Sequence, residues 1–308
     1  MNAIEVAGLR RTFRVRRTVL TAVDGIDFTV TAGEMVGYIG PNGAGKSTTI
    51  KMLTGILVPT AGRIRVAGLE PARRRTELAR RIGVVFGNRS LLWWDLPLGQ
   101  SFDLLRHVYR VPASDHRQRL AELVDVLELG PLLDRPVRQL SLGQRLRGEL
   151  TAALLHAPEV LFLDEPTVGL DIVSRARVRE FLLELNRRGG VTVLLTTHDL
   201  ADIERLSSRL LIIDHGRVIH DGTIERLIAD YGEERTLVVD LQDAVEPLEI
   251  DRARVVRVDG PRQWLRFRRD ELTAAQLAAA VAERASLVDL TVEEPDIEDV
   301  VRRIYAEG

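Results

Sequence analysis

Cysteine is absent from the 308 residues, which excludes disulfide bonds, thiol catalysis and thiolate metal sites. Long apolar runs are absent too: VTVLL and LLII have the length of a strand, far below the ~18 residues that span a bilayer. The opening residues, MNAIEVAGLRR, contain no apolar segment, so we expect no secretory signal. The net charge is only −2, which argues against a dominant nucleic-acid-binding surface, and we predict no nucleic-acid partner.

The chain is long enough for about two domains, and the pattern of its apolar residues changes near residue 230. Before that point, apolar strand-like runs alternate with helix-like segments, which indicates a parallel sheet covered on both faces. The runs are Met35–Ile39, Val160–Leu163, Val191–Leu195 and Leu210–Ile213. A helical block at about 90–155 interrupts them as an insertion. We therefore predict an α/β domain over residues 1–230.

Beyond residue 230 the pattern becomes that of half-exposed strands. The segments TLVVDL, ARVVRV and WLRFRR alternate apolar and polar side chains. A helix is expected at about 272–285, a strand at Leu287–Val292 and a last helix at 296–306. We therefore predict a second, small α+β domain over residues 231–308.

A glycine-rich turn separates the first apolar run from a helix-like segment. It reads GPNGAGKST and fits the pattern G-x-x-x-x-G-K-[ST]. Backbone N–H groups in such a turn can cradle phosphate, and the following helix offers its positive end. Lys46 would reach the β- and γ-phosphates, and the hydroxyl of Ser47 would bind Mg²⁺. The strand before it and the helix after it favour this interpretation over a chance turn. The predicted contacts are Gly40, Pro41, Asn42, Gly43, Ala44, Gly45, Lys46, Ser47 and Thr48.

Two acids end another apolar run, VLFLDEP. A strand beside the phosphate turn would place Asp164 near Mg²⁺, and Glu165 could polarise a water for in-line attack on the γ-phosphate. Two solvated acids at a strand end are the alternative, which the phosphate turn disfavours.

The segment LSLGQ predicts the start of a helix. Ser141 and Gln144 have the spacing of a capping box. A helix start is the simpler interpretation, but a capped helix N-terminus is also a second phosphate site, able to face the nucleotide of another subunit.

Together these motifs resemble the ATP-binding subunit of an ABC transporter, over about residues 1–228. The resemblance implies a P-loop NTPase (RecA-like) fold, ATP and Mg²⁺ as ligands, and ATP hydrolysis. By resemblance, GPNGAGKST is the Walker A loop, LSLGQ the signature and VLFLDEP the Walker B strand. It also implies roles for Phe13 as the aromatic on adenine, Asp171 in the D-loop and His198 as the switch histidine. A lone Phe in a strand is more often simply part of a core.

Asn88 departs from the family pattern. The Q-loop of the family usually carries Gln at this place, which contacts Mg²⁺ and the attacking water and links to the membrane partner. Asn keeps the amide and is one methylene shorter. By resemblance Asn88 is a predicted contact of the nucleotide and of Mg²⁺. Two interpretations of the exchange stay open: the shorter side chain weakens direct metal contact, or the exchange is neutral drift.

The resemblance also implies partners. Two such domains close head-to-tail over two ATPs, so Ser141, Gly143 and Gln144 would complete the site of a second copy in a homodimer or a heterodimer. The segment FGNRSLLWWDLP and the C-terminal domain resemble the type-two exporter group, whose substrates are drugs, lipids or polysaccharides. We expect a polytopic membrane permease as partner, which would hold the chain at the cytoplasmic face of a bacterial plasma membrane.

Two other functions share the ATPase motifs. An importer subunit is disfavoured only by the exporter-like features. A soluble ABC ATPase acting on DNA or ribosomes is disfavoured because the chain has no long coiled-coil insertion, no zinc-binding cysteines and one ATPase domain.

Trp93 and Trp94 stand side by side in FGNRSLLWWD, although the chain has only three Trp. One small core would struggle to bury both indoles. We expect one indole to pack inward and the other to face outward, where an exposed aromatic suits a protein interface. The alternative is that both fold under the helical insertion.

Overall fold

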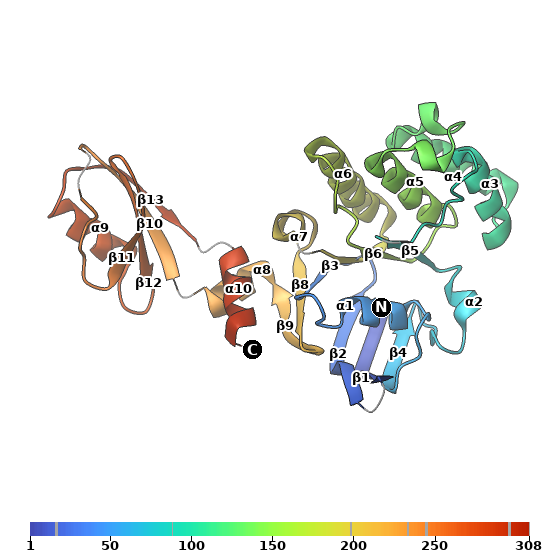
Figure 1. Cartoon of the computed structure of the whole chain (residues 1–308), viewed down its shortest axis with the longest axis horizontal. Helices are drawn as coiled ribbons and strands as arrows, with labels where there is room; N and C mark the ends of the chain where they lie inside the picture. Colours follow the sequence, from blue (N-terminus) through green and yellow to red (C-terminus); the bar gives the residue numbers. More distant parts are fainter. Residues whose placement is uncertain are drawn as a thin grey trace. The chain divides into compact units, whose positions relative to one another are not determined.

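The computed structural model describes residues 1–15, 18–87, 89–197, 199–232, 234–243, 246–294 and 297–307. The chain divides into two compact units, Met1–Gly222 and Thr223–Gly308 (Figure 1). Among the described residues, no helix has the length and hydropathy that a membrane crossing requires.

Six described strands of the first unit form one sheet in the order β5-β6-β7-β3-β8-β9. The pairs β5–β6, β6–β7, β7–β3 and β3–β8 are parallel. Every residue of β3 and β7 is buried, as expected for strands covered on both faces. The strands are β3 (Met35–Ile39), β5 (Ile82–Phe86), β6 (Val160–Asp164), β7 (Thr192–Thr196), β8 (Arg209–Asp214) and β9 (Arg217–Thr223). The predicted α/β fold is confirmed.

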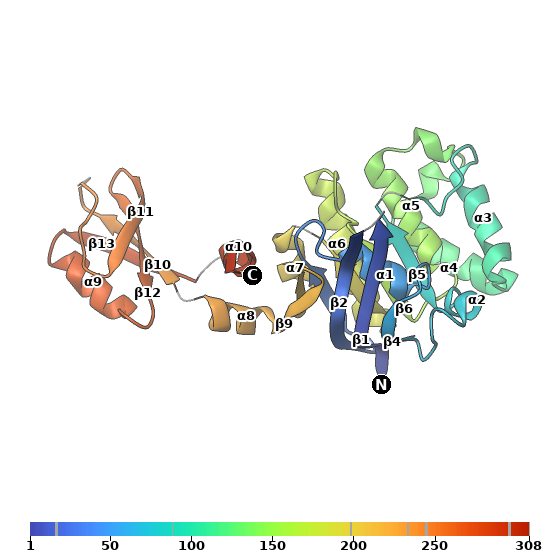
Figure 2. The ribbon, with the colours of Figure 1, turned by 60° about the horizontal axis from the view of Figure 1, so that its bottom comes forward.

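A three-stranded antiparallel sheet lies beside this core, in the order β2-β1-β4 (Figure 2). Its strands are β1 (Asn2–Val15), β2 (Thr18–Thr31) and β4 (Ala61–Val66). Apolar residues of these strands share one core with β3 and α1 (Lys46–Leu53). The apolar pattern of the sequence predicts a strand at Ile64–Val66, within β4, and two shorter ones at Ile4–Ala7 and Phe28–Val30, within β1 and β2. The structure extends both, because the antiparallel ladder continues out to the pair Val15 and Thr18, where polar side chains hide the strand pattern.

Helices α3 (Leu98–Tyr109), α4 (Ala113–Val126) and α5 (Leu142–Leu154) gather in the helical block (Figure 1). Helix α5 is the most connected of them, since it packs against α3, α4, strand β5 and α6 (Ile172–Gly189). From Gly148 to Leu154 its residues are all buried. The unit is completed by α2 (Arg75–Leu78) and α7 (Leu200–Leu206).

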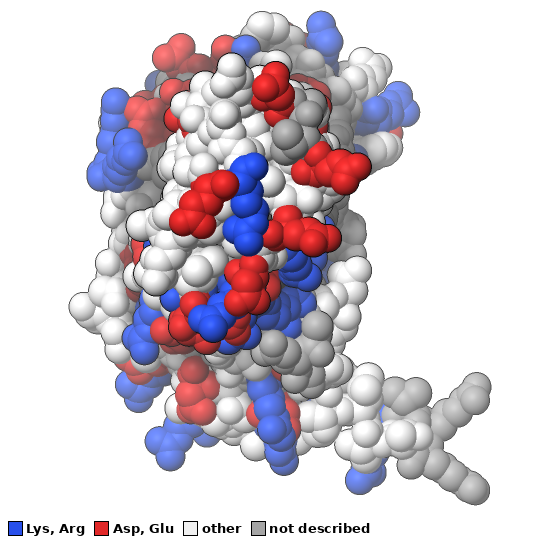
Figure 3. Space-filling model, turned by 90° about the vertical axis from the view of Figure 1, so that its left-hand side faces the viewer, with Lys and Arg blue, Asp and Glu red and all other residues white. Residues whose placement is uncertain are grey.

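The second unit contains an antiparallel sheet in the order β11-β12-β10-β13. One face of this sheet packs Leu237, Leu265 and Phe267 against α9. Ion pairs such as Arg262–Asp240 and Arg254–Glu234 cross the strands. Figure 3, which faces this unit, accordingly shows basic and acidic side chains interspersed. The elements are α8 (Ile224–Tyr231), β10 (Glu234–Leu241), β11 (Ala253–Asp259), β12 (Arg262–Arg268), α9 (Ala274–Ala282), β13 (Leu287–Glu293) and α10 (Ile297–Glu307).

Candidate functional site

The glycine-rich turn connects β3 to α1 at the carboxyl edge of the parallel sheet. Gly45, just before α1, has φ +109°, and a Cβ there would lie 2.4 Å from the carbonyl oxygen of Ala22. A Cβ on Gly40 would lie 2.2 Å from the carbonyl oxygen of Ile213. Only glycine therefore fits at these two positions. No side chain caps the N-terminus of α1, so no capping side chain accepts a hydrogen bond from its first N–H groups.

This turn, Asp164 at the end of β6 and Glu165 directly after it line one cavity of about 380 Å³. Its lining consists of Ala22, Pro41, Asn42, Gly43, Gly45, Lys46, Ser47, Thr48, Gly87, Asp164 and Glu165. The Nζ of Lys46 donates to the carbonyl of Pro41 at 3.1 Å and to the carbonyl of Gly40. Burial lowers the pKa of Lys46, while the charges of Glu165 and Asp164 oppose that shift. The structure thus brings the predicted phosphate-binding cation and both predicted acids together.

Strand β7 fixes the two acids. Asp164 and Thr196 are register partners in the sheet, and the hydroxyl of Thr196 donates to Oδ1 of Asp164 at 2.7 Å. The N–H of Glu165 donates to the carbonyl of Thr196 at 3.0 Å. Glu165 has φ +57°, a left-handed conformation that non-glycine residues rarely adopt. Such backbone strain costs about 1–3 kcal/mol and persists where the surroundings enforce it, commonly at active sites.

The donor set on the cavity wall fits Mg²⁺. Mg²⁺ takes oxygen ligands and is usually held by one or two protein groups together with phosphates of the substrate. The Ser47 hydroxyl and the Asp164 carboxylate are such oxygen donors, and both line the cavity. Asn88, the third predicted metal contact, lies outside the described residues, as does the predicted switch residue His198.

The predicted capping box at the start of α5 is confirmed. The N–H of Gln144 donates to the Ser141 hydroxyl at 3.2 Å, and the N–H of Ser141 donates to Oε1 of Gln144 at 3.0 Å. Gly143 packs tightly, since a Cβ there would lie 2.8 Å from the hydroxyl oxygen of Ser174 on α6. Ser141, Gly143 and Gln144 do not line the 380 Å³ cavity of their own chain.

Two further predicted residues also lie away from that cavity wall. Phe13 is half-buried on β1, with the Arg11 guanidinium carbon 4.6 Å from its ring centre. Asp171 is the N-cap of α6 and accepts bonds from the N–H and hydroxyl of Ser174. The hydrogen bond from the Ser174 hydroxyl is the main reason that the pKa of Asp171 lies below its ordinary value.

A buried ion pair between α6 and α7 was not among the predictions. Asp202 on α7 is fully buried, and it accepts hydrogen bonds from the Thr167 hydroxyl and the Arg179 guanidinium. A second pair, Arg175 with Asp199, joins the same two helices, α6 and α7. Only the four-residue spacing of the two arginines, which puts them on one helix face, could have suggested it.

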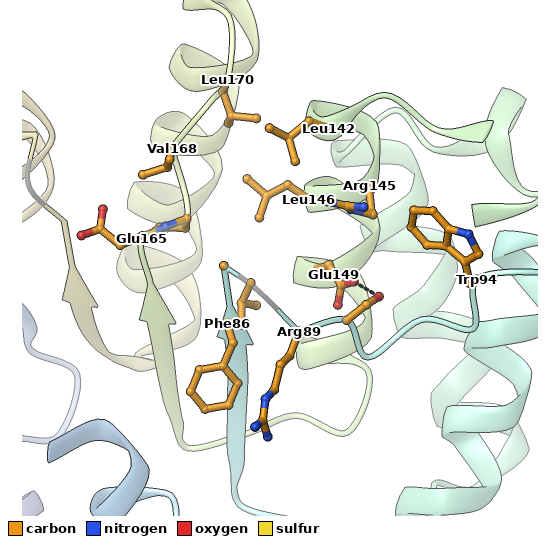
Figure 4. Close-up of a pocket in the computed structure, with 14 residues that line it drawn as sticks. Phe86, Arg89, Trp94, Leu142, Arg145, Leu146, Glu149, Glu165, Val168 and Leu170 are labelled. Carbon is orange, nitrogen blue, oxygen red and sulfur yellow. Dashed lines mark hydrogen bonds between the residues drawn. The ribbon is translucent and has the colours of Figure 1, made fainter. Parts of the chain in front are cut away.

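A second cavity, of about 280 Å³, adjoins the first at Gly87 and Glu165 (Figure 4). Trp94 lies on its wall near Arg145. Trp93 and Trp94 are 40% and 52% exposed, so the prediction that one indole packs inward is wrong for the chain alone. Leu92, at 6% exposure, is the neighbouring residue that packs inward instead.

Comparisons with known proteins agree with this geometry. Residues 23–168 match the family described as ABC transporter. The daunorubicin resistance ATP-binding protein DrrA3 of Streptomyces coeruleorubidus is 40% identical over 237 residues, which cover 77% of this chain and 73% of that protein. The chain belongs to the ABC transporter ATP-binding family.

Other members of this ABC family match as well. Nod factor export ATP-binding protein I of Paraburkholderia xenovorans is 42% identical over 212 residues, 68% of each chain. Among solved structures, an ATP-binding subunit of an ABC transporter is 29% identical, with a TM-score of 0.67 over 75% of this chain and 93% of the other. A bacterial ABC transporter cassette solved as a dimer is 25% identical, with a TM-score of 0.64 over 72% and 98%.

Membership in the ABC family confirms three predictions. The fold is that of a P-loop NTPase cassette, the ligand is ATP, and the activity is ATP hydrolysis. The cavity that joins the glycine-rich turn to Asp164 and Glu165 is where the geometry supports this chemistry.

Proposed function

We propose that this chain is the ATP-hydrolysing subunit that powers a separate membrane-embedded exporter. The observation that carries the proposal is the single cavity lined by Lys46, Ser47, Asp164 and Glu165. Relatives named for daunorubicin resistance, Nod factor export and linearmycin resistance support a drug-, lipid- or polysaccharide-type substrate.

In the proposed mechanism, the turn N–H groups and Lys46 bind the phosphates of ATP. Mg²⁺ held by Ser47 and Asp164 would supply charge neutralisation on those phosphates. Glu165 orients the attacking water and accepts its proton, and the strained backbone turns its side chain onto the cavity wall. Thr196 holds the Asp164 carboxylate by its hydroxyl. Phe13 would stack on adenine, and Asn88, Asp171 and His198 would complete the site.

The proposed ATPase works as a homodimer or heterodimer. Ser141, Gly143 and Gln144 lie at a capped helix N-terminus that does not line the cavity of its own chain. A helix N-terminus stabilises anions, so these residues would bind the phosphates held by a second copy. Leu142 between them is 43% exposed and would lie in that interface.

The proposed membrane partner docks at the tryptophans. Trp93 and Trp94 are exposed on the loop between β5 and α3, beside the 280 Å³ cavity. Exposed aromatics that adjoin a cavity are typical of protein interfaces. Such a partner would hold the chain at the cytoplasmic face of the membrane. The ATPase domain would be residues 1–230, with the accessory domain in 231–308.

Two variants test the hydrolytic roles. Lys46→Ala removes a phosphate contact, so nucleotide binding should weaken and turnover should stop. Glu165→Gln keeps the cradle intact, so ATP should still bind while hydrolysis slows and a closed dimer accumulates. Binding is measured by calorimetry, hydrolysis by phosphate release and dimerisation by light scattering. Near wild-type hydrolysis by Glu165→Gln would disprove the role of that carboxylate.

A further inference from the structure

Glu149 is an acid buried in the middle of the signature helix α5. Glu149 is 6% exposed, and both of its carboxylate oxygens accept hydrogen bonds. Oε1 accepts from the hydroxyl of Ser90, the bond drawn dashed at Glu149 in Figure 4, and Oε2 accepts from the N–H of Leu91 at 2.9 Å. The hydroxyl oxygen of Ser90 also accepts from the N–H of Leu92 at 3.0 Å. One carboxylate therefore shapes three successive residues of the loop that carries the tryptophans.

Packing alone does not explain an acid here. Burial raises the pKa of Glu149, and the bonds from Ser90 and Leu91 oppose that shift. Residues 150–154 of the same helix are buried and mostly apolar, so an apolar side chain would suit this environment. Buried polar groups cost desolvation free energy and are best known for fixing one specific arrangement of the chain. The arrangement fixed here is that of α5 and the loop at 90–94.

Helix α5 holds the same loop at a second point. Arg145 lies one turn before Glu149 on the same helix face. Its guanidinium carbon is 5.6 Å from the ring centre of Trp94, within cation–π range. Figure 4 shows Arg145, Glu149 and Trp94 at this junction. At its N-terminal end, α5 begins with the capping box of Ser141.

We propose that Arg145 and Glu149 form a two-point link that makes the tryptophan loop follow the signature helix. This inference rests on the proposed function. When α5 docks on the ATP of a second subunit, the link moves the exposed tryptophans with the helix. When a membrane partner binds the tryptophans, the same link acts on α5. It uses other residues than Asn88, the position expected from the family pattern. Arg145 and Glu149 are positioning residues, since neither lines the 380 Å³ nucleotide cavity.

The tryptophans themselves report on this link. The chain has three Trp, so Trp264→Phe leaves Trp93 and Trp94 as its only tryptophan emitters, which are excited selectively over the four Tyr. In a Trp264→Phe/Glu165→Gln protein, MgATP should change the emission maximum and the acrylamide quenching of this pair, whereas MgADP should change them less. Adding Glu149→Ala or Arg145→Ala should remove most of the MgATP-dependent change, while the dissociation constant for MgATP from calorimetry stays the same.

Arg147→Ala is the matched control. Arg147 lies on α5 between the two link residues, and its side chain is 14% exposed. It donates to the carbonyl of Leu127 at 2.7 Å, so it ties α5 to α4 rather than to the loop. Arg147→Ala should lower the melting temperature and leave the MgATP-dependent change intact. Equal loss in Arg147→Ala and Glu149→Ala would show general destabilisation and overturn the link.

Milder variants keep the test decisive if Glu149→Ala does not fold. Ser90→Ala removes one donor of the link, and Glu149→Gln keeps an acceptor for it. Both should reduce the MgATP-dependent change, and Glu149→Gln should reduce it less than Glu149→Ala. If the Trp264→Phe/Glu165→Gln protein binds MgATP without any change in tryptophan fluorescence, the link is refuted and the proposed function is not. If the Trp264→Phe/Glu165→Gln protein binds no MgATP, both the proposed function and the link are refuted.

Discussion

The buried ion pair of Arg179 and Asp202 joins α6 to α7, and its contribution to the stability of the first unit can be tested quantitatively. The Asp202 side chain is 1% exposed and that of Arg179 is 13% exposed. Arg179→Ala would leave a buried carboxylate whose remaining side-chain partner among the described residues is the Thr167 hydroxyl. Removing one partner of a buried ion pair costs about 3–5 kcal/mol. For a unit of this size, ~1 kcal/mol shifts the melting temperature by ~2–4 °C, so the expected drop is ~6–20 °C.

Differential scanning calorimetry measures this drop, and the transition of the first unit is identified because MgATP raises it. Arg188→Ala is the matched control on the same helix, since Arg188 is 82% exposed and pairs with Glu184 one turn away. Such surface pairs contribute ~0.3–0.5 kcal/mol. Arg179→Met with Asp202→Leu should recover part of the loss, because an apolar replacement of a whole pair is often neutral. Equal shifts for Arg179→Ala and Arg188→Ala would refute the reasoning.

Three further predictions concern the site and its surfaces. Mixing Lys46→Ala with Ser141→Arg protein leaves one composite site with both lesions and one with neither, so phosphate release should partly return; no recovery at any ratio, although heterodimers form, contradicts shared sites. Trp93→Ala and Trp94→Ala should each shift the melting temperature little, since both indoles are exposed, while at least one weakens co-purification with the membrane partner. Normal co-purification of both variants would argue against docking there. Lys46→Arg should release far less phosphate than the wild-type protein, because the planar guanidinium is bulkier than the ammonium that the turn surrounds. Wild-type turnover by this variant would show that a positive charge at this position is sufficient.

The parts of the site that were predictable are those set by short patterns. The turn before α1, the acids at and after the end of β6 and the capping box of Ser141 each depend on residues that are close together in the sequence. Local sequence determines such features because the partners are neighbours in the chain. The same holds for the buried strands, whose apolar runs are continuous.

The parts that were not predictable depend on contacts between distant segments. The Thr196 hydroxyl reaches Asp164 across 32 residues, and the Ser90 hydroxyl reaches Glu149 across 59. The left-handed backbone of Glu165, whose N–H donates to Thr196 of strand β7, has no sequence signature. The exposure of both tryptophans was also missed, because the adjacent Leu92, and neither indole, is the residue that the fold buries.

Lysine and arginine have different roles in this chain: a lysine lines the nucleotide cavity, and arginines form ion pairs that join elements of the fold. Lys46 is one of only two lysines, and its compact ammonium suits the point-charge contact that a phosphate turn requires. Apart from Lys51, the other Lys and Arg positions are all arginines, whose planar forks suit two-pronged pairing. Arg209 donates to both oxygens of Asp221, at 2.6 and 2.8 Å, and also to Glu34 at 3.1 Å, which connects β8 to β9 and to the chain before β3. Arginine therefore holds elements together in this fold, and the single cation on the wall of the 380 Å³ cavity among the described residues is a lysine.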